Sequence, residues 1–362
     1  MHCPRLDHFV RLNADGTVGK CGHMTNAKGF RSHEDLERSE WLKNIKEQMS
    51  AGHWPDECMR CQQSERVKGE SIRTNTISRH RMLHPIRDDY LIVGGVLDNI
   101  CNSACQSCNA NLSTKIGSLE SRDYPRIDNY HVFKKLPLDR VIELDVNGGE
   151  PTASKNYKKV LSELPANTKI VRMNTNGSRM IKELEEVLKK NIMVIVTMSL
   201  DGIGKVHDYA RWPIKWTDYK KTVSAYQDLQ KKYRLLQLDF WTTVSCLNIK
   251  NLPEIINYAK NKGIPHDWAF LDNPSELNIR YKNKLTIETI ITNSKEVLGV
   301  NNKKDLAEVP DSIKKNMEII PVKNVDEVLK IALTKNLKRV EWVEVEQISK
   351  NKTREESKAP IN

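Results

Sequence analysis

Several features are absent from this 362-residue sequence, and each absence excludes a class of protein. No apolar run approaches the ~20 residues that a transmembrane helix needs, so we expect neither a membrane span nor a membrane partner. The N-terminus shows no signal peptide, because residues 1–4 lead directly into a predicted hairpin. No internal repeat is visible. We therefore expect a cytoplasmic protein, located in the host cytoplasm if a phage encodes it.

Eight cysteines are present, and without an export signal we expect them to stay reduced and to bind metals. The length allows one large domain and a smaller one. The net charge of +11 and the pI near 9.1 permit a nucleic-acid or acidic-peptide partner. The lysines are scattered along the chain, however, and we favour an ordinary solvated surface as their explanation.

Three of the cysteines, Cys101, Cys105 and Cys108, lie close together in the sequence, directly after an apolar run at 90–97 that predicts a buried strand. Thiolates gathered in this way bind zinc or an iron–sulfur cluster. A structural zinc site needs four protein ligands, whereas three cysteines suit a four-iron cluster with one iron left open. From the spacing alone, a chance triplet or a zinc knuckle remains an alternative.

A second set of four cysteines lies near the N-terminus, at Cys3, Cys21, Cys58 and Cys61. Cys3 and Cys21 flank the strands of a hairpin that an Asp-Gly turn predicts. Cys58 and Cys61 form a Cys-x2-Cys pair, whose sulfurs can reach one metal. Together the four suit a closed zinc site or a second four-iron cluster. The alternative for Cys3 and Cys21, which we favour less, is that they are small buried hydrophobes, and Cys246 is expected to be plain core.

The middle of the chain alternates between predicted strands and helices. The expected strands lie at 90–97, 141–146, 169–173, 192–198, 236–244 and 267–271. The expected helices lie at 112–121, 157–164, 178–190, 216–233 and 252–262, with an irregular stretch at 122–137. Six such units predict a parallel sheet curled into a partial (β/α)6 barrel of the α/β class.

We expect three domains. Residues 1–88 form a cysteine-rich module of a hairpin and a helix at 33–49, followed by a basic, turn-rich connector at 73–87. Residues 89–272 form the partial barrel. Residues 273–362 form an extension with helices at 281–298 and 325–337 and a charged tail, and no residue pattern there indicates any chemistry.

Unusual motifs follow four consecutive strands. The cysteine triplet follows the first strand, and Gly148-Gly149-Glu150-Pro151, residues 174–177 and residues 199–202 follow the next three. Ligand sites in parallel sheets lie at the carboxyl ends of the strands. Because all four motifs fall on that one edge, we expect a single ligand site there.

These residues together resemble the core of the radical S-adenosylmethionine (SAM) enzymes, in the branch with an extra cysteine module called a SPASM or twitch domain. The N-terminal hairpin and Cys-x2-Cys pair also resemble phage-type twitch proteins. The resemblance implies that Gly148, Gly149, Glu150 and Pro151 contact the SAM amino group, with that role given to Glu150. It implies further contacts to the SAM carboxylate and ribose from Asn176, Ser199, Asp201 and Arg211.

From the residues alone, Arg211 could equally form a surface ion pair, and Asp201 could be a turn former before Gly202. Two features depart from the family pattern. Ser107 stands where an apolar or aromatic residue often lies near adenine, which puts that contact in doubt. The extra cysteine module precedes the core here, whereas it usually follows it.

The resemblance implies that Cys101, Cys105 and Cys108 hold a [4Fe-4S] cluster whose open iron binds SAM. Reductive cleavage of SAM gives a 5′-deoxyadenosyl radical, which takes a hydrogen atom from a substrate. The implied partners are a flavodoxin-like or ferredoxin-like electron donor and a peptide or protein substrate. A second iron–sulfur cluster would carry electrons, or would only staple the N-terminal module together.

Two alternatives stay open. One is a radical SAM enzyme that modifies a nucleoside or tRNA, which the basic charge would suit. The other is a zinc-stabilised protein without catalytic activity that binds nucleic acid, in which His131 would serve as a fourth ligand to the triplet. This second alternative does not explain why the Gly-Gly-Glu-Pro segment falls on the triplet's edge of the sheet.

Overall fold

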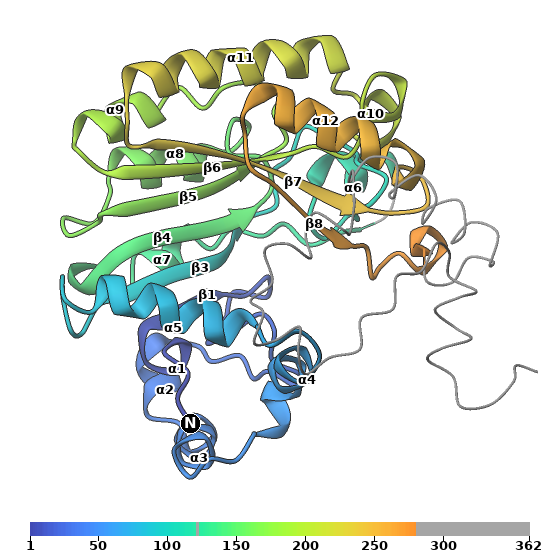
Figure 1. The fold of residues 1–362 in the computed structure, drawn as a ribbon. Helices are drawn as coiled ribbons and strands as arrows, with labels where there is room; N and C mark the ends of the chain where they lie inside the picture. Colours follow the sequence, from blue (N-terminus) through green and yellow to red (C-terminus); the bar gives the residue numbers. More distant parts are fainter. Residues whose placement is uncertain (121–122, 280–362) are drawn as a thin grey trace, which may run out of the picture. The chain divides into compact units, whose positions relative to one another are not determined.

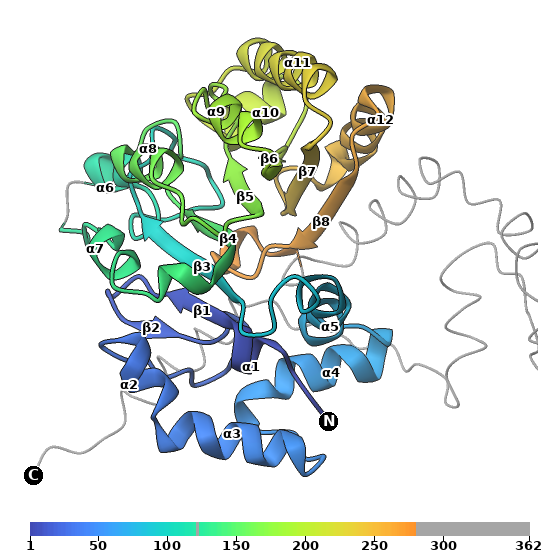
Figure 2. The same cartoon turned by 90° about the vertical axis from the view of Figure 1, so that its left-hand side faces the viewer.

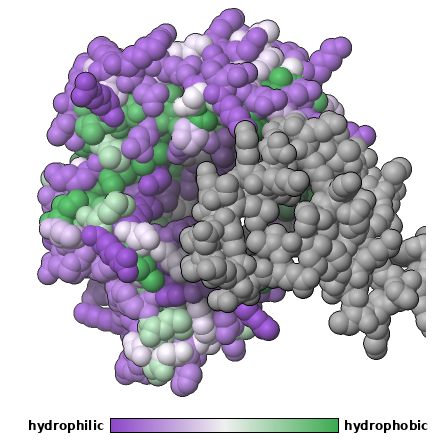
Figure 3. All heavy atoms as spheres, viewed as in Figure 1, coloured by the Kyte–Doolittle hydropathy of each residue, from purple (hydrophilic) through white to green (hydrophobic). Residues whose placement is uncertain are grey.

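The computed structural model describes residues 1–120 and 123–279, all of which belong to the unit Met1–Gly299. The helices expected at 281–298 and 325–337 and the charged tail lie outside the described residues. Within the described part, no helix is both long and apolar enough to cross a membrane. In Figure 3 the visible surface is mostly hydrophilic, including the part over α11 (Trp216–Lys232).

One mixed sheet of eight strands organises the fold, in the order β2-β1-β3-β4-β5-β6-β7-β8 (Figure 1). All six strands predicted from the apolar runs are present and parallel. They are β3 (Leu91–Asp98), β4 (Val141–Gly148), β5 (Ile170–Thr175), β6 (Met193–Ser199), β7 (Leu236–Val244) and β8 (His266–Phe270). Figure 2 shows the strands along an arc, with helices on its outer side.

The N-terminal hairpin is part of this sheet. β1 (Phe9–Leu12) pairs antiparallel with β2 (Val18–Gly19), as predicted, and its other edge pairs parallel with β3. The sequence did not indicate this second pairing, because β1 and β3 are far apart along the chain and nothing local specifies the contact. The cysteine-rich module is therefore continuous with the sheet.

The helices between the strands agree with the predictions in place, although some are shorter. They are α6 (Thr114–Glu120), α8 (Lys155–Ser162), α9 (Leu184–Lys189), α11 and α12 (Leu252–Lys262). Two short helices, α7 (Tyr130–Phe133) and α10 (Lys205–Ala210), were not predicted. The helices bury apolar side chains against the convex side of the sheet in one core, which includes Leu144, Val196 and Tyr226.

The first 71 residues form short helices around the hairpin, namely α1 (Arg5–His8), α2 (His33–Glu37), α3 (Glu40–Ser50) and α4 (Met59–Lys68). The single helix predicted at 33–49 is thus two helices. The break falls at Arg38 and Ser39, where the Ser39 hydroxyl caps α3 by accepting a hydrogen bond from the Leu42 amide at 3.2 Å.

The expected connector at 73–87 is wrong for most of its length, because α5 (Ile72–Leu83) is a regular helix. Its N-terminus is a capping box in which Ser71 and Thr74 satisfy each other's backbone amides. The sequence hid this helix because only Thr76 and Leu83 are buried, so the apolar periodicity is weak.

Helix α5 lies at the open side of the arc, between β1 and β8 (Figure 2). Leu83 packs there with Phe9, Tyr90, Ile92 and Ile142. One turn before Leu83 on α5, Arg79 forms an ion pair with the fully buried Glu143 of β4. Glu143 also accepts a hydrogen bond from Arg172 Nε of β5 at 2.9 Å. The cysteine-rich module thereby reaches the concave face of the sheet.

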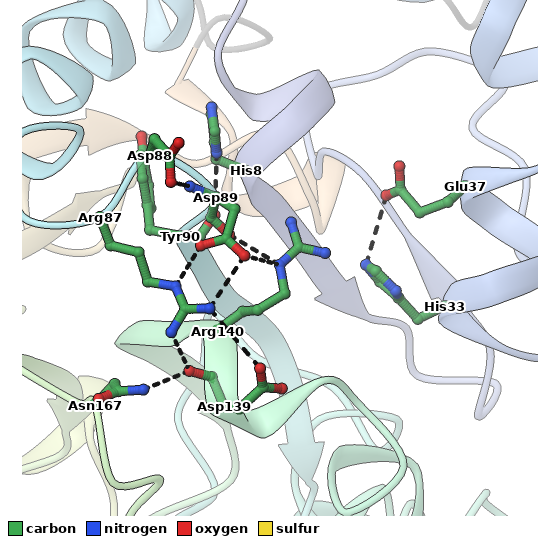
Figure 4. A network of polar contacts seen from close by, with 10 residues as sticks. All are labelled: His8, His33, Glu37, Arg87, Asp88, Asp89, Tyr90, Asp139, Arg140 and Asn167. Atoms are coloured by element: carbon green, nitrogen blue, oxygen red, sulfur yellow. Dashed lines mark hydrogen bonds and ion pairs between the residues drawn. The ribbon is translucent and has the colours of Figure 1, made fainter.

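A polar network joins the beginnings of β3 and β4 (Figure 4). Arg87 forms an ion pair with Asp89 and donates to the Asp139 carbonyl at 2.8 Å. Arg140 Nε donates to the Asp89 carbonyl at 2.8 Å, and Asn167 donates to the Asp139 carbonyl at 2.6 Å. These contacts fix the amino ends of the strands, at the edge opposite the candidate site.

Candidate functional site

The three cysteines of the triplet lie in a loop, residues 99–113, that leaves the carboxyl end of β3. We call this segment the cysteine loop. Cys101, Cys105 and Cys108 are half-buried free thiols. The Cys101 amide donates to Thr114 Oγ1 at 3.1 Å, and Ser113 Oγ donates to the Ser103 carbonyl at 2.6 Å. The start of α6 thus holds one side of the loop.

The other side of the cysteine loop is held by the segment after α10. The Ala104 amide donates to the Trp212 carbonyl at 2.7 Å, and the Gln106 amide donates to the Ala210 carbonyl at 2.9 Å. Both contacts use backbone groups. The loop therefore has a defined path between α6 and α10.

The three thiols interact electrostatically with one another. Burial raises the pKa of the Cys105 thiol to about 12, and Cys108 and Cys101 add to that rise, whereas the nearby Arg211 guanidinium opposes it. Burial also raises the pKa values of Cys101 and Cys108. In the absence of metal the thiols therefore keep their protons at neutral pH, and metal binding would release them.

The Gly-Gly-Glu-Pro segment packs directly against the start of the cysteine loop. The Gly149 amide donates to the Asp98 carbonyl at 2.8 Å, and the Glu150 amide donates to the Ile100 carbonyl at 2.7 Å. A Cβ atom on Gly149 would lie 2.0 Å from the Ile100 oxygen, and one on Gly148 (φ +134°) would lie 2.0 Å from the Asp98 oxygen. This backbone contact requires both glycines.

The Glu150 side chain points into the protein. It is 1% exposed, and Oε1 accepts from the Thr152 amide at 3.1 Å and from the Thr152 and Thr175 hydroxyls at 2.9 Å each. Oε2 accepts from the Asn176 amide at 2.7 Å. Burial raises the pKa of this carboxyl group, and these hydrogen bonds oppose the rise. The carboxyl oxygens are thus engaged by the protein, and Pro151 beside them is buried as well.

Asn176, after β5, turns its amide toward the cysteine loop. Nδ2 donates to Asn102 Oδ1 and to Ser103 Oγ, both at 2.8 Å, and Oδ1 accepts from the Ser178 amide at 2.9 Å. Asn102 Nδ2 in turn donates to Ser178 Oγ at 3.0 Å. The ends of β3 and β5 are therefore joined through side chains.

Asp201 and Arg211 form a buried ion pair behind Cys105. Arg211 Nη1 donates to Asp201 Oδ2 at 2.8 Å, and Asp201 Oδ1 accepts from the Thr243 amide at 2.8 Å. The side chains are 11% and 4% exposed for Arg211 and Asp201 respectively. Arg211 Nε has no partner among the described residues. The ion pair that we considered for Arg211 is therefore buried and does not lie at the surface. Ser199, at the end of β6, is half-buried.

His207 lies behind Arg211 and was not singled out in the sequence. It is fully buried and packs against Trp216 and Tyr219, with ring centroids 5.4 and 4.6 Å away. Burial and the neighbouring Arg211 lower its pKa to about 3. Nothing in the residue pattern indicates this burial, because Lys205, Asp208 and Tyr209 lie close to His207 along the chain.

The second cysteine set also comes together. One pocket is lined by all four cysteines of this set, Cys3, Cys21, Cys58 and Cys61, and also by Arg5, His23 and Arg73. Its volume is about 360 Å³, a value that includes the space open to solvent. Burial raises the pKa of Cys3 to about 11 and that of Cys58 to about 12, and other cysteines of the set add to both rises. Among the described residues, no group of three or more His, Cys, Asp and Glu side chains is arranged around a single metal ion.

Comparison with known sequences gives two unrelated results. Residues 282–335 match the model of the Lon protease (S16) C-terminal proteolytic domain. A Lon protease of Azospirillum brasilense is 52% identical over 48 residues, which is 13% of this chain and 6% of that protein. The mycofactocin maturase MftC of Mycolicibacterium smegmatis is 30% identical over 112 residues, or 31% of this chain and 28% of the maturase. The chain thus spans well under two thirds of either relative.

The Lon-like segment lies outside the described residues. It falls in the extension where the residue pattern indicated no chemistry, and it covers too little of the chain to assign a family.

Comparison with solved structures gives SAM-bound proteins. The structure of native anSMEcpe with bound AdoMet covers 60% of this chain and 62% of its own, with a TM-score of 0.43 and 15% identity. That of Streptococcus suis SuiB bound to S-adenosylmethionine covers 83% and 70%, with a TM-score of 0.43 and 13% identity. At such scores the likeness supports no conclusion about function.

Proposed function

We propose that this chain is a radical SAM enzyme, with a [4Fe-4S] cluster at Cys101, Cys105 and Cys108 and SAM at the carboxyl ends of the strands. One observation carries the proposal. The Gly-Gly-Glu-Pro backbone donates hydrogen bonds at 2.8 and 2.7 Å to the carbonyls of Asp98 and Ile100, where β3 leads into the loop that holds three free thiols. The similarity to a maturase over 112 residues supports it independently.

The donor set fits such a cluster. Thiolates are its usual ligands, and the chain provides three of them in one loop, which leaves one iron for SAM. The positive charge of Arg211 beside Cys105 favours the thiolate form that ligation requires. Hydrogen bonds hold the loop on both sides, toward α6 and toward α10, so its path is defined, although among the described residues its thiols are not arranged around a single metal ion.

The protein groups left for SAM differ from the resemblance at Glu150 and Asn176, whose side chains are engaged within the protein. Because the Glu150 carboxyl is engaged internally, the backbone of residues 148–151 is what remains to contact the SAM amino group. Arg211 Nε lacks a partner among the described residues and can donate to the SAM carboxylate. Ser199 and Asp201 lie at neighbouring strand ends, where we place the ribose.

When bound, the cluster and SAM would supply the radical chemistry that takes a hydrogen atom from the substrate, with the electron coming from an external donor. The chain's own part is to bind, orient and exclude water at the strand ends. By resemblance we propose a peptide or protein substrate and an external one-electron donor of the flavodoxin or ferredoxin type. A nucleoside or tRNA substrate would be the alternative within the same chemistry.

We extend the proposal to the rest of the described fold. Residues 89–272, with β3 to β8 and their helices, form the partial (β/α)6 barrel. Residues 1–88 form the auxiliary module, where Cys3, Cys21, Cys58 and Cys61 hold a second iron–sulfur cluster. The convergence of all four thiols on one pocket supports this assignment. A cytoplasmic location remains a prediction.

The test is anaerobic purification of the full chain, with iron and zinc analysis and an absorption spectrum. We expect iron, sulfide and broad absorption near 400 nm, about where iron–sulfur proteins absorb. Cys246→Ala is the matched control, because Cys246 belongs to neither set and should leave the spectrum unchanged. A colourless, zinc-loaded protein would refute the proposal and favour the zinc-stabilised alternative.

A further inference from the structure

Both side-chain N–H donors of Asn176 are used within the protein. An asparagine side chain offers two N–H donors on Nδ2, and here they go to Asn102 Oδ1 and Ser103 Oγ at 2.8 Å each. Its Oδ1 accepts from the Ser178 amide at 2.9 Å. The side chain is 5% exposed. Asn176 therefore cannot donate to a ligand without releasing the cysteine loop.

Glu150 fixes Asn176 in turn. The Glu150 Oε2 atom accepts from the Asn176 backbone amide at 2.7 Å, and Oε1 accepts from the neighbouring Thr175 hydroxyl at 2.9 Å. Both hydrogen bonds are buried, and hydrogen bonds to a charged or strongly polar group in such surroundings are among the stronger ones. The carboxyl group after β4 thus sets the position of the residue after β5.

The two loop residues that Asn176 holds, Asn102 and Ser103, lie between Cys101 and Cys105. The remaining contacts of this stretch are a backbone hydrogen bond from Ala104 to Trp212 and side-chain contacts from Ser113 Oγ to the Ser103 carbonyl and from Asn102 Nδ2 to Ser178 Oγ. The Asn176 amide is thus a side-chain anchor of the cysteine loop that a single substitution can remove without altering the loop's own sequence.

We propose that Glu150 and Asn176 act as positioning residues that hold the segment between Cys101 and Cys105 in the conformation needed to bind the cluster, and that they do so without SAM. This inference rests on the proposed function, because holding the loop in one conformation serves cluster binding only if the loop binds a cluster. It assigns both side chains to the protein scaffold, whereas the family resemblance assigned them to SAM.

The experiment is hydrogen exchange on the anaerobically purified protein and on its iron-free form, both without SAM, in the wild type, in Asn176→Asp and in Asn174→Asp. Asn176→Asp keeps the size of the side chain but removes both donors, and it places a carboxylate oxygen against Asn102 Oδ1. Asn174→Asp is the matched control, because it makes the same change two positions earlier on β5, at an exposed side chain.

We expect the amides of residues 101–105 to exchange about tenfold faster in Asn176→Asp, which corresponds to about 1.4 kcal/mol for the lost pair of hydrogen bonds. The iron content should also fall by the share that the cysteine loop binds, while the N-terminal cysteine set keeps its iron, and Glu150→Gln should reproduce both effects in weaker form. Asn174→Asp should match the wild type in residues 101–105.

Unchanged exchange in residues 101–105 of Asn176→Asp would overturn the inference, and so would equal acceleration throughout β3 to β6, which would indicate general destabilisation. A wild type that binds no iron at all would instead refute the proposed function. The two failures are therefore distinguishable in one set of samples.

Discussion

The Asp201–Arg211 ion pair gives the sharpest stability prediction. Replacing Asp201 by Asn keeps the size of the side chain and the hydrogen bond from the Thr243 amide, but it removes the charge that faces Arg211 at 2.8 Å. With side chains only 4% and 11% exposed, water cannot replace the lost partner. Breaking a buried pair from one side costs about 3–5 kcal/mol. Because the Thr243 bond survives, we expect a value near the lower end, about 3 kcal/mol.

The measurement is the free energy of unfolding from urea titrations at neutral pH. Asp228→Asn is the matched control, since Asp228 pairs with Lys231 at the same 2.8 Å but with side chains that are 71% and 77% exposed. Exposed pairs contribute about 0.2–1 kcal/mol, and salt screens them. If Asp201→Asn and Asp228→Asn destabilised the protein equally, the argument from burial would be wrong.

Three further predictions concern His207, the glycine pair and the second cysteine set. His207 has its pKa lowered to about 3 from 6.5, so the unfolded chain binds the proton first as the pH falls, and stability is lost from pH 6.5 toward pH 3. Urea unfolding at pH 6.5 and pH 4 should show that His207→Phe loses about 3 kcal/mol less than the wild type over this interval, and equal losses would contradict the burial. Gly149→Ala should displace the Ile100 carbonyl, because the added Cβ would lie 2.0 Å from its oxygen. Iron analysis should then show that the cysteine loop has lost its metal, and full retention of that iron would contradict this contact. Replacing Cys58 and Cys61 by Ala should lower the iron content but leave 5′-deoxyadenosine formation from SAM in place, whereas unchanged iron would remove the case for a second cluster.

Periodicity and turn residues predicted the strands of the fold well. Runs such as β3 and β6 are apolar because these strands are largely buried, and β-branched residues dominate β6, whereas the residues of β8 are mostly exposed. The parallel pairing of β1 with β3 escaped prediction because it is a long-range contact with no local signal. Helix α5 escaped because one face meets the polar concave side of the sheet, so the helix lacks an apolar stripe.

The candidate site was predictable as a set of positions, but not as a set of contacts. The carboxyl ends of neighbouring parallel strands lie at the same edge of a sheet, so the motifs after β3, β4, β5 and β6 were expected to lie close together. The sequence could not show that Glu150 faces inward or that Asp201 pairs with Arg211, because side-chain direction at the end of a strand depends on neighbours from other strands. No motif within residues 282–335 indicated the similarity to the Lon protease domain.

The most direct test of the central claim is the anaerobic formation of 5′-deoxyadenosine from SAM with a strong reductant. The wild type and Cys246→Ala should both form it. Replacing Cys101, Cys105 and Cys108 together by Ala should abolish it, while the N-terminal cysteine set keeps its iron. Undiminished 5′-deoxyadenosine in the triple variant would contradict the assignment of the cysteine loop as the place where SAM is cleaved.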